Sequence, residues 1–167
     1  MKALIAVLAV FLASCGGTVG PAKTEDATVE LKPLIEKLMA DWSTLDPAKV
    51  AAYYAKEPGL PFYDIMPLKY SGWQEYEDGT KKVFSNWKAL RLIAGPDLKA
   101  YKNGNIAWVT FTFTFEVTPN TGDVMKGEGR NTQVLEKRGN DWLIVHEHVS
   151  VPMADAPPPP PPPSKKK

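Results

Sequence analysis

Two acidic residues, Asp64 and Glu147, stand among apolar neighbours and could carry acid–base chemistry. Asp64 ends a short apolar stretch, and Glu147 alternates with valines. A carboxyl group buried among apolar side chains has a raised pKa and can act as an acid or a base. With Tyr70 or His146 to stabilise oxyanion charge, the pair could catalyse enolisation of an apolar substrate. The alternative is that each carboxylate lies at a rim and pairs with a base such as Arg130.

His146 and His148 are the only histidines and lie two residues apart. On a strand this spacing places both rings on one face, the face of Ile144 and Ser150. Two imidazoles could bind a metal ion or relay a proton. No further histidine, cysteine or HExxH spacing completes a metal site. We therefore expect no metal and no other cofactor, and a structural or subunit-contact role for His146 and His148, and also for Arg130.

The elements that must position these residues begin with helices. Apolar residues recur at helical spacing over residues 28–42, which predicts an amphipathic helix despite Pro33. Asp46 followed by Pro47 is typical of a capped start and predicts a short second helix. Residues 62–66 are a short strand candidate. A third helix is expected over residues 73–90, with an interruption around Gly79.

From there the apolar period changes from helical to two residues, which indicates strands. Residues 107–117 alternate apolar and polar, so we expect one long strand with two different faces. Segments 92–101, 124–137 and 142–151 complete an antiparallel meander. Helices followed by a curled sheet predict an α+β fold in which the strands form a cone around the helices and leave a cavity.

The N-terminal residues are typical of an export signal. Lys2 precedes an apolar run, and the run ends in the Leu-Ala-Ser-Cys sequence at residues 12–15. This run is shorter than the ~20 residues of a spanning helix. The pattern resembles a lipoprotein lipobox, which implies cleavage before Cys15 and lipid on its thiol. Cys15 is the only cysteine, so no disulfide within the chain is possible. Because Gly16 is not aspartate, the resemblance favours the outer membrane in a Gram-negative cell.

The C-terminal segment is proline-rich. Seven prolines at residues 157–163 precede Ser164 and three lysines. Such a run adopts polyproline II and forms no internal hydrogen bonds. We expect a stiff tail, with contact to a cell-wall polymer or a partner protein as the functional alternative. The formal net charge of +1 includes these terminal lysines, and a concentrated basic face for nucleic acid is not indicated.

Two stretches resemble a known family. The first runs from Phe62 through Trp73, and the second spans residues 130–152, with the Trp-Leu-Ile-Val-His-Glu-His sequence at its centre. Both resemble SnoaL-like members of the nuclear transport factor 2-like (NTF2-like) superfamily. The second is also similar to the association domain of calcium/calmodulin-dependent protein kinase. The resemblance implies a cone-shaped domain, often dimeric. It leaves the activity open, because this superfamily includes isomerases, dehydratases and proteins without a reaction.

The resemblance and the aromatic content together suggest a ligand pocket. Basic pocket residues of the kinase association domain correspond to Thr110, Gln133 and Val149, so an anion pocket is not carried over. Large aromatic side chains could line a cavity for a flat apolar ligand, or could simply form the core. The pocket candidates are Tyr54, Asp64, Tyr70, Trp73, Trp108, Thr110, Gln133 and Glu147.

These observations divide the chain into four parts: a signal peptide with the lipobox cysteine (1–15), a tether (16–25), a SnoaL-like domain (26–152) and a proline-rich tail (153–167). The function expected is that of a lipid-anchored cell-envelope protein with a pocket for a small apolar ligand, without catalysis and as a homodimer. One alternative is a cofactor-independent isomerase or dehydratase. A second is an oligomerisation scaffold that presents the proline-rich tail.

Overall fold

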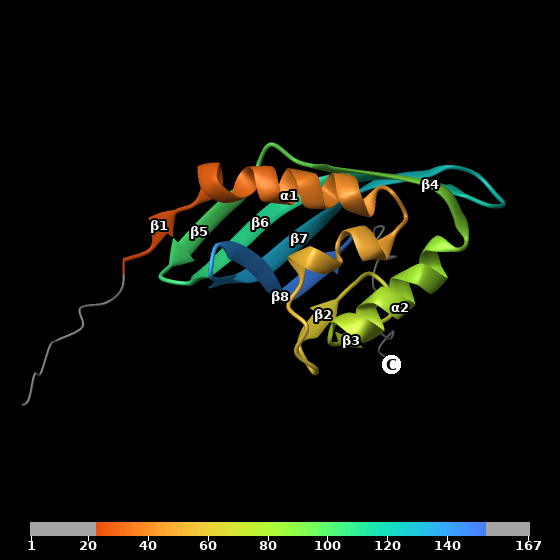
Figure 1. Cartoon of the computed structure of the whole chain (residues 1–167). Helices are drawn as coiled ribbons and strands as arrows, with labels where there is room; N and C mark the ends of the chain where they lie inside the picture. The colour runs from red at the N-terminus through yellow and green to blue at the C-terminus, as the bar shows by residue number, and fades with distance from the viewer. Residues whose placement is uncertain (1–22, 153–167) are drawn as a thin grey trace, which may run out of the picture.

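A helix packs across one face of a long, curved sheet, and a second helix closes the same face further along (Figure 1). The computed structural model describes residues 23–152. The helical elements are α1 (Thr28–Trp42), the 3-10 turns η1 (Pro47–Lys49) and η2 (Ala51–Tyr53), and α2 (Trp73–Phe84). The strands are β1 (Glu25–Asp26), β2 (Pro61–Tyr63), β3 (Tyr70–Ser71), β4 (Trp87–Ala94), β5 (Lys99–Asn103), β6 (Ile106–Pro119), β7 (Met125–Arg138) and β8 (Asp141–Ser150).

The first helix forms as its apolar spacing predicts. One stripe of α1 is buried against the sheet: Leu31, Ile35, Leu38, Met39 and Trp42. Pro33 lies near the start of α1, where its missing N–H costs little. The expected second helix is only the two 3-10 turns, and the Asp46 carboxylate accepts the N–H of Ala48 as an N-cap.

The second long helix is uninterrupted but shorter than expected, because it ends at Phe84 and the chain enters β4 at Trp87. Gly79 does not break it. A Cβ at position 79 would lie 2.2 Å from a ring carbon of Tyr70, so glycine allows this tyrosine to pack directly against α2. The helix is therefore held against β3 by close packing at a glycine.

The sheet has the order β1-β5-β6-β7-β8-β2-β3, and β4 pairs with the second half of β6. The segments of the expected meander pair antiparallel, as predicted. The short strand β2, which was not part of that meander, adds to β8 in parallel, so the complete sheet is mixed. The single strand expected at residues 92–101 is two strands, separated at Gly95 and Pro96. The remaining pairs of this α+β fold are antiparallel.

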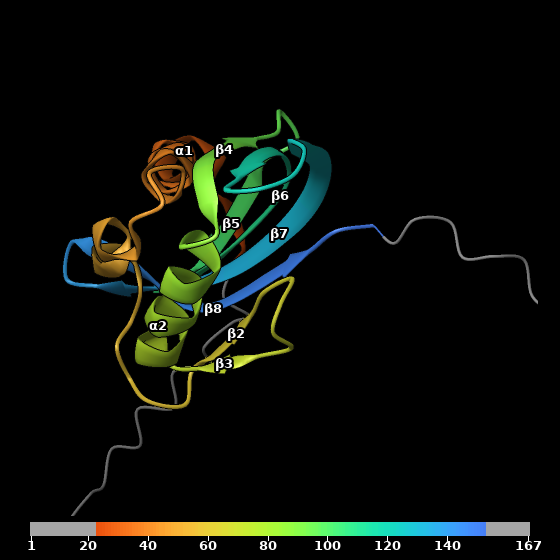
Figure 2. The same ribbon diagram turned by 90° about the vertical axis from the view of Figure 1, so that its right-hand side faces the viewer.

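Strong curvature brings the far end of β6 and β7 around the helices (Figure 2). At the curved end Phe113 faces Gly129 and Phe115 faces Gly127 across the β6–β7 pair. A Cβ on Gly129 would lie 2.4 Å from the Phe113 ring, and one on Gly127 would lie 2.6 Å from the Phe115 ring. Glycine thus lets two aromatic rings cover the neighbouring strand, as in curved sheets generally.

The predicted lipobox and the proline-rich tail lie outside the described residues. Within residues 23–152, no helix is both long and apolar enough to cross a membrane.

Candidate functional site

A cavity of about 310 Å³ lies on the inner side of the curved sheet. Helices α1 and α2 form one wall, and strands β4, β6, β7 and β8 form the other. Most of the lining is apolar or aromatic: Met39, Trp42, Tyr76, Val83, Phe84, Trp87, Leu90, Leu92, Phe113, Phe115, Val117 and Val149. The polar side chains at the cavity are Asp64, Thr80, Asn131 and Glu147, together with the Tyr76 hydroxyl. Such a concave apolar chamber with few polar groups is typical of a small-molecule site.

Glu147 is the centre of a buried hydrogen-bond network and is only 2% exposed. Its Oε1 accepts bonds of 2.7 Å from the side-chain amides of Asn131 and Gln133. Its Oε2 accepts the hydroxyls of Tyr54 at 2.7 Å and Tyr76 at 3.1 Å. Four neutral donors, from Tyr54 just after η2, from α2 and from β7, therefore hold this carboxylate, and no base is among them.

The orientation of Glu147 depends on an irregularity in β8. Gln133 of β7 pairs with Glu147 of β8, and Leu135 pairs with Ile144. Two residues along β7 therefore correspond to three along β8, so β8 contains one extra residue between these pairs. The extra residue of such a bulge reverses the alternation of faces. Ile144 and Glu147 consequently both point inward, which corrects the expectation that Ile144 shares the face of His146 and His148.

The two tyrosines that donate to Glu147 are held as neutral phenols. Burial raises the pKa of Tyr54 and of Tyr76 well above the usual 10, and the negative charge of Glu147 raises both further. Trp42 donates its indole N–H to the Tyr54 oxygen at 3.1 Å. The network thus continues from the carboxylate to α1.

Asp64 lies just after β2 and lines the same cavity, half-buried. Its Oδ1 accepts the backbone N–H of Ile65 at 2.7 Å. Burial is the main cause that raises the pKa of Asp64 to about 6; the Ile65 N–H opposes the rise and the charge of Glu147 adds to it. The structure therefore brings the two candidate carboxylates to one cavity, and Asp64 can exchange a proton near neutral pH.

Buried polar atoms without a partner mark the same region. Among the described residues these are the Tyr70 hydroxyl, Asn131 Oδ1 and Gln133 Oε1. Both amide nitrogens point at Glu147, so the amide orientations are fixed and their oxygens point away from it. Unpaired buried acceptors are costly. Asn131 is the one of these three residues that lines the cavity.

Other sequence candidates divide between the core and the outer sheet face. Trp73 is buried and stacks on Tyr54 with ring centroids 4.6 Å apart. Trp108 stacks on Tyr101 at 5.8 Å, and Thr110 is exposed. Because Ala107, Val109 and Phe111 take the inner positions of β6, Trp108 and Thr110 face outward, and the expectation that they line the pocket is wrong.

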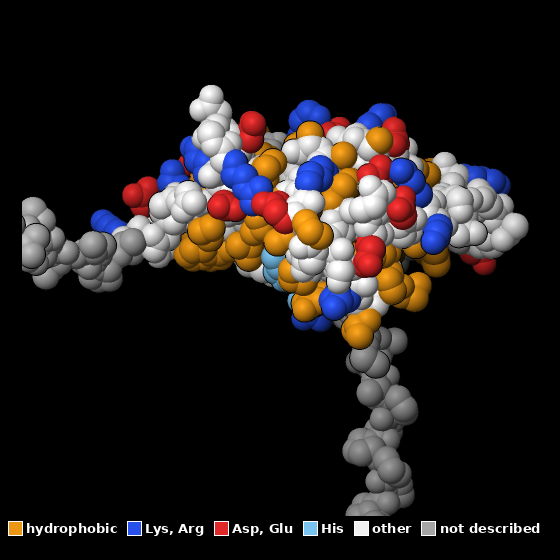
Figure 3. All heavy atoms as spheres, turned by 60° about the horizontal axis from the view of Figure 1, so that its bottom comes forward, with side chains coloured by type: hydrophobic (Ala, Val, Ile, Leu, Met, Phe, Trp, Pro, Cys, Tyr) orange, Lys and Arg blue, Asp and Glu red, His pale blue; other side chains and the backbone are white. Residues whose placement is uncertain are grey.

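The histidines also lie away from the cavity. His146 Nδ1 is 2.7 Å from the Pro61 carbonyl oxygen, and the Tyr63 ring meets the rings of both His146 and His148 edge-on. Figure 3 shows histidine surface among hydrophobic side chains on this face. Within residues 23–152 no group of three or more His, Cys, Asp or Glu side chains could hold a metal ion. Arg130 is exposed on the strand face opposite to that of Asn131 and does not pair with Glu147.

Tyr76 and Asn131 were missed by the sequence reasoning. Asn131, Gln133 and Leu135 share one strand face, and an amide pair beside a buried leucine was the available signal. Tyr76 lies on the buried face of α2 between Trp73 and Thr80, but its spacing is the same as that of an ordinary core residue. No pattern in the sequence distinguishes a core tyrosine from one that donates to a carboxylate.

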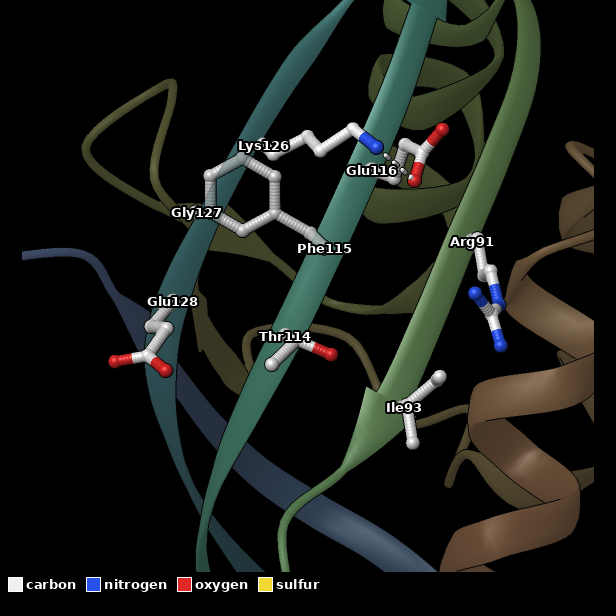
Figure 4. A pocket seen from close by; sticks show the side chains of 8 residues that line it. All are labelled: Arg91, Ile93, Thr114, Phe115, Glu116, Lys126, Gly127 and Glu128. Carbon is white, nitrogen blue, oxygen red and sulfur yellow. Dashed lines mark ion pairs between the residues drawn. The ribbon is translucent and has the colours of Figure 1, made fainter.

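Two further hollows lie outside the cavity. One, of about 360 Å³, lies over β4, β6 and β7; there Lys126 and Glu116 form an ion pair of 2.9 Å while Arg91 lies apart on β4 (Figure 4). The other, of about 610 Å³, lies beside β2 and β8 and is lined by Tyr63, Lys69 and His148 among others. The polar side chains around the first are exposed or half-buried and already partly paired, so the inner cavity is the better candidate site.

Comparison with known proteins agrees with this architecture. A solved NTF2-like superfamily protein from Salmonella enterica matches with a TM-score of 0.67 and 21% identity, over 78% of this chain and 96% of that one. A candidate calcium/calmodulin-dependent protein kinase II association domain from Xanthomonas campestris matches with a TM-score of 0.63 and 22% identity, over 73% and 85%. A candidate dehydratase of the NTF2-like family from Streptomyces avermitilis matches with a TM-score of 0.66 and 16% identity, over 77% and 99%.

At these identities the structural matches establish the fold alone. Among curated proteins no significant match is found. The sequence profile of the SnoaL-like domain matches residues 31–154, which is most of the chain and nearly all of the described domain. The chain therefore belongs to the SnoaL-like domain family.

Proposed function

We propose that this domain binds a small, largely apolar molecule in the cavity between the helices and the curved sheet. The observation that carries the proposal is the cavity itself, with its apolar walls and a few convergent polar groups around Glu147. Its volume of about 310 Å³ is at the lower end of the range for ligand sites.

Binding without catalysis is favoured because Glu147 is fully engaged. All four of its hydrogen bonds come from protein groups, so the carboxylate has no lone pair left to accept a substrate proton. This arrangement fixes the floor of the cavity. Removing a proton from a substrate requires an acceptor that is free to bind it.

One observation favours an enzyme as the second candidate. Asp64 lines the cavity with a pKa raised to about 6, as a general base would require. In that case Asp64 removes the proton, and the Tyr76 hydroxyl, which lines the same cavity, stabilises the developing charge only by giving up its hydrogen bond to Glu147. The candidate dehydratase of Streptomyces avermitilis shares the fold and is the reason to test elimination of water first.

A cavity-filling substitution tests the binding proposal. Titration calorimetry with 1-naphthylmethanol, a neutral apolar probe, should detect binding to the wild-type domain. Val149→Phe places a ring in the cavity and should weaken binding by at least about tenfold. Thr110→Phe, on the outer sheet face, is the matched control and should leave it unchanged. Equal binding to all three proteins would show that the probe occupies another surface.

We further propose that lipid on Cys15 holds the domain at the cell envelope, with an outer-membrane location in a Gram-negative cell. The support is the sequence: the basic start, the apolar run and the small residues before Cys15. Cys15→Ala should leave an uncleaved or mislocalised precursor, because lipid transfer precedes cleavage. Cell fractionation and detergent partitioning measure this, and an unchanged soluble mature protein would refute it.

A homodimer is the proposed assembly. The association domain from Xanthomonas campestris shares the fold, and its description implies assembly. Analytical ultracentrifugation of residues 23–152 measures the oligomeric state directly. A monomer at all protein concentrations would contradict the proposal.

A further inference from the structure

The cavity contains acidic groups without a basic counterpart. Asp64 and Glu147 both line it, while none of its lining residues within the described part of the chain is lysine, arginine or histidine. Lys69 and His148 line the adjoining hollow beside β2 and β8, which shares Asp64, Ile65, Val149 and Val151 with the cavity. Buried carboxylates are ordinarily paired with a positive charge. Here the compensating positive charge is missing from the protein's side of the cavity.

The hydrogen bonds to Glu147 do not neutralise it. Its donors are two amides and two phenols, all uncharged. The Tyr phenols remain neutral because burial and the carboxylate raise the pKa of each. Among the described residues no positive group contacts Glu147, and the chamber beside it has apolar walls, where electrostatic interactions are stronger than in water.

Six aromatic side chains surround the same space: Trp42, Tyr76, Phe84, Trp87, Phe113 and Phe115. The face of an aromatic ring attracts cations, most strongly when the cation has lost its water. The rings of Trp42 and Phe84 meet at right angles with centroids 5.9 Å apart, and Trp42 and Tyr76 are 5.7 Å apart. These rings are inclined to one another by 42° and 81°, so they do not form one flat slot.

The unpaired acceptor of Asn131 supplies an independent sign. Its Oδ1 is buried without a partner, and Asn131 lines the cavity beside Glu147. The amide cannot turn around, because its nitrogen donates to Glu147. A ligand with N–H groups beside Asn131 matches this acceptor once the atoms that cover the oxygen shift, whereas a carboxylate or phosphate ligand would face acceptors and no base.

We propose that the ligand is an apolar organic cation, an amine that is protonated at neutral pH, with its ammonium group near Asp64, Asn131 and Glu147 and its apolar body among the aromatic rings. This inference rests on the proposed binding function and specifies its ligand class. It excludes anionic ligands from the cavity.

Three probes of one shape test the inference. Calorimetry at pH 7.5, on the full domain of residues 23–152, compares 1-naphthylmethylamine (cation), 1-naphthylmethanol (neutral) and 1-naphthoate (anion). We expect the amine to bind at least about tenfold more tightly than the alcohol and the anion to bind most weakly. Equal affinity for amine and alcohol would overturn the inference and leave the binding function standing. Binding of none of the three would overturn both.

Charge-neutral variants locate the preference. Asp64→Asn keeps the shape of the side chain and should reduce the amine-to-alcohol ratio several-fold without weakening the alcohol. Asp123→Asn removes the same charge from an exposed position outside the cavity and should leave the ratio unchanged. An equal reduction in both variants would show that the preference reflects overall charge, and the inference would then fail.

Discussion

Carboxylates on the two faces of the sheet have different surroundings: the outer one is paired with a lysine, and the inner one is buried among neutral donors. On the outer face, Glu116 of β6 pairs with Lys126 of β7 at 2.9 Å, and both side chains are exposed (Figure 4). On the inner face, Glu147 is buried among neutral donors and Asp64 borders the cavity without a base. Exposed ion pairs contribute little to stability, whereas a buried carboxylate without a cation costs free energy.

The comparison separates groups that stabilise the domain from groups that serve a ligand. Loss of the outer Glu116–Lys126 pair should have little effect on the stability of the domain or on ligand binding. Glu147 organises η2, α2 and β7 around one point, so it positions the cavity floor while remaining an electrostatic cost. A charged group retained at such a cost, beside an unpaired acceptor, is typical of a functional site.

The largest expected effect comes from Glu147. Glu147→Gln replaces one acceptor oxygen by an N–H₂ group that faces donors already pointing at it. Each donor left without an acceptor costs about 1 to 3 kcal/mol. The variant should therefore lose at least that much free energy of unfolding in urea. A stable Glu147→Gln domain would show that the donors rearrange freely and that the network does not hold the cavity.

The physical reason for this loss differs from the two alternatives that the sequence left open. From sequence, Glu147 either carries a burial penalty, which Gln would relieve, or pairs with Arg130. The structure shows Arg130 exposed on the other face and four neutral donors in its place. No sequence pattern identifies Tyr54 and Tyr76 as donors, because these tyrosines are far from Glu147 in the sequence and reach it only in the folded chain.

The fold itself was largely predictable, since periodicity predicts α1 and the long strands, and residues 62–73 and 130–152 carry the family resemblance. What could not be predicted are local irregularities: the β8 bulge, the parallel pairing of β2 with β8, and the turn between β4 and β5. A single bulge residue reverses which side chains face inward. The site residues of β8 were thus identifiable, but their orientation relative to Ile144 was not.

A smaller effect is expected at Asp64, and its sign depends on pH. Because the folded-state pKa is raised to about 6 from 3.8, the neutral acid is favoured in the fold. Asp64 therefore lowers stability progressively as pH rises from about 4 to about 6, and by a constant amount above that. Asp64→Asn should match the wild type near pH 4 and be more stable at about pH 7.5, by roughly 1 to 3 kcal/mol.

Urea unfolding at the two pH values measures this difference. The groups that face Asp64 are Glu147, Tyr54, Tyr70 and Tyr76 on the cavity side, with Lys69 and His148 on the outer side; they are present in both proteins. The difference between the curves therefore isolates residue 64. A difference independent of pH would mean that Asp64 is solvated, and the second, enzymatic candidate would lose its base.

The smallest effect is expected at the outer ion pair. Glu116→Gln removes a charge from a side chain that is 38% exposed, opposite a lysine that is 67% exposed. Water and salt screen such a pair, so the free energy of unfolding should fall by less than about 1 kcal/mol, and by less still in high salt. Unfolding at low and high salt, with Glu147→Gln alongside, measures the contrast between the faces. If Glu116→Gln cost as much as Glu147→Gln, the outer face would be as constrained as the inner one, and burial would not be what distinguishes the two carboxylates.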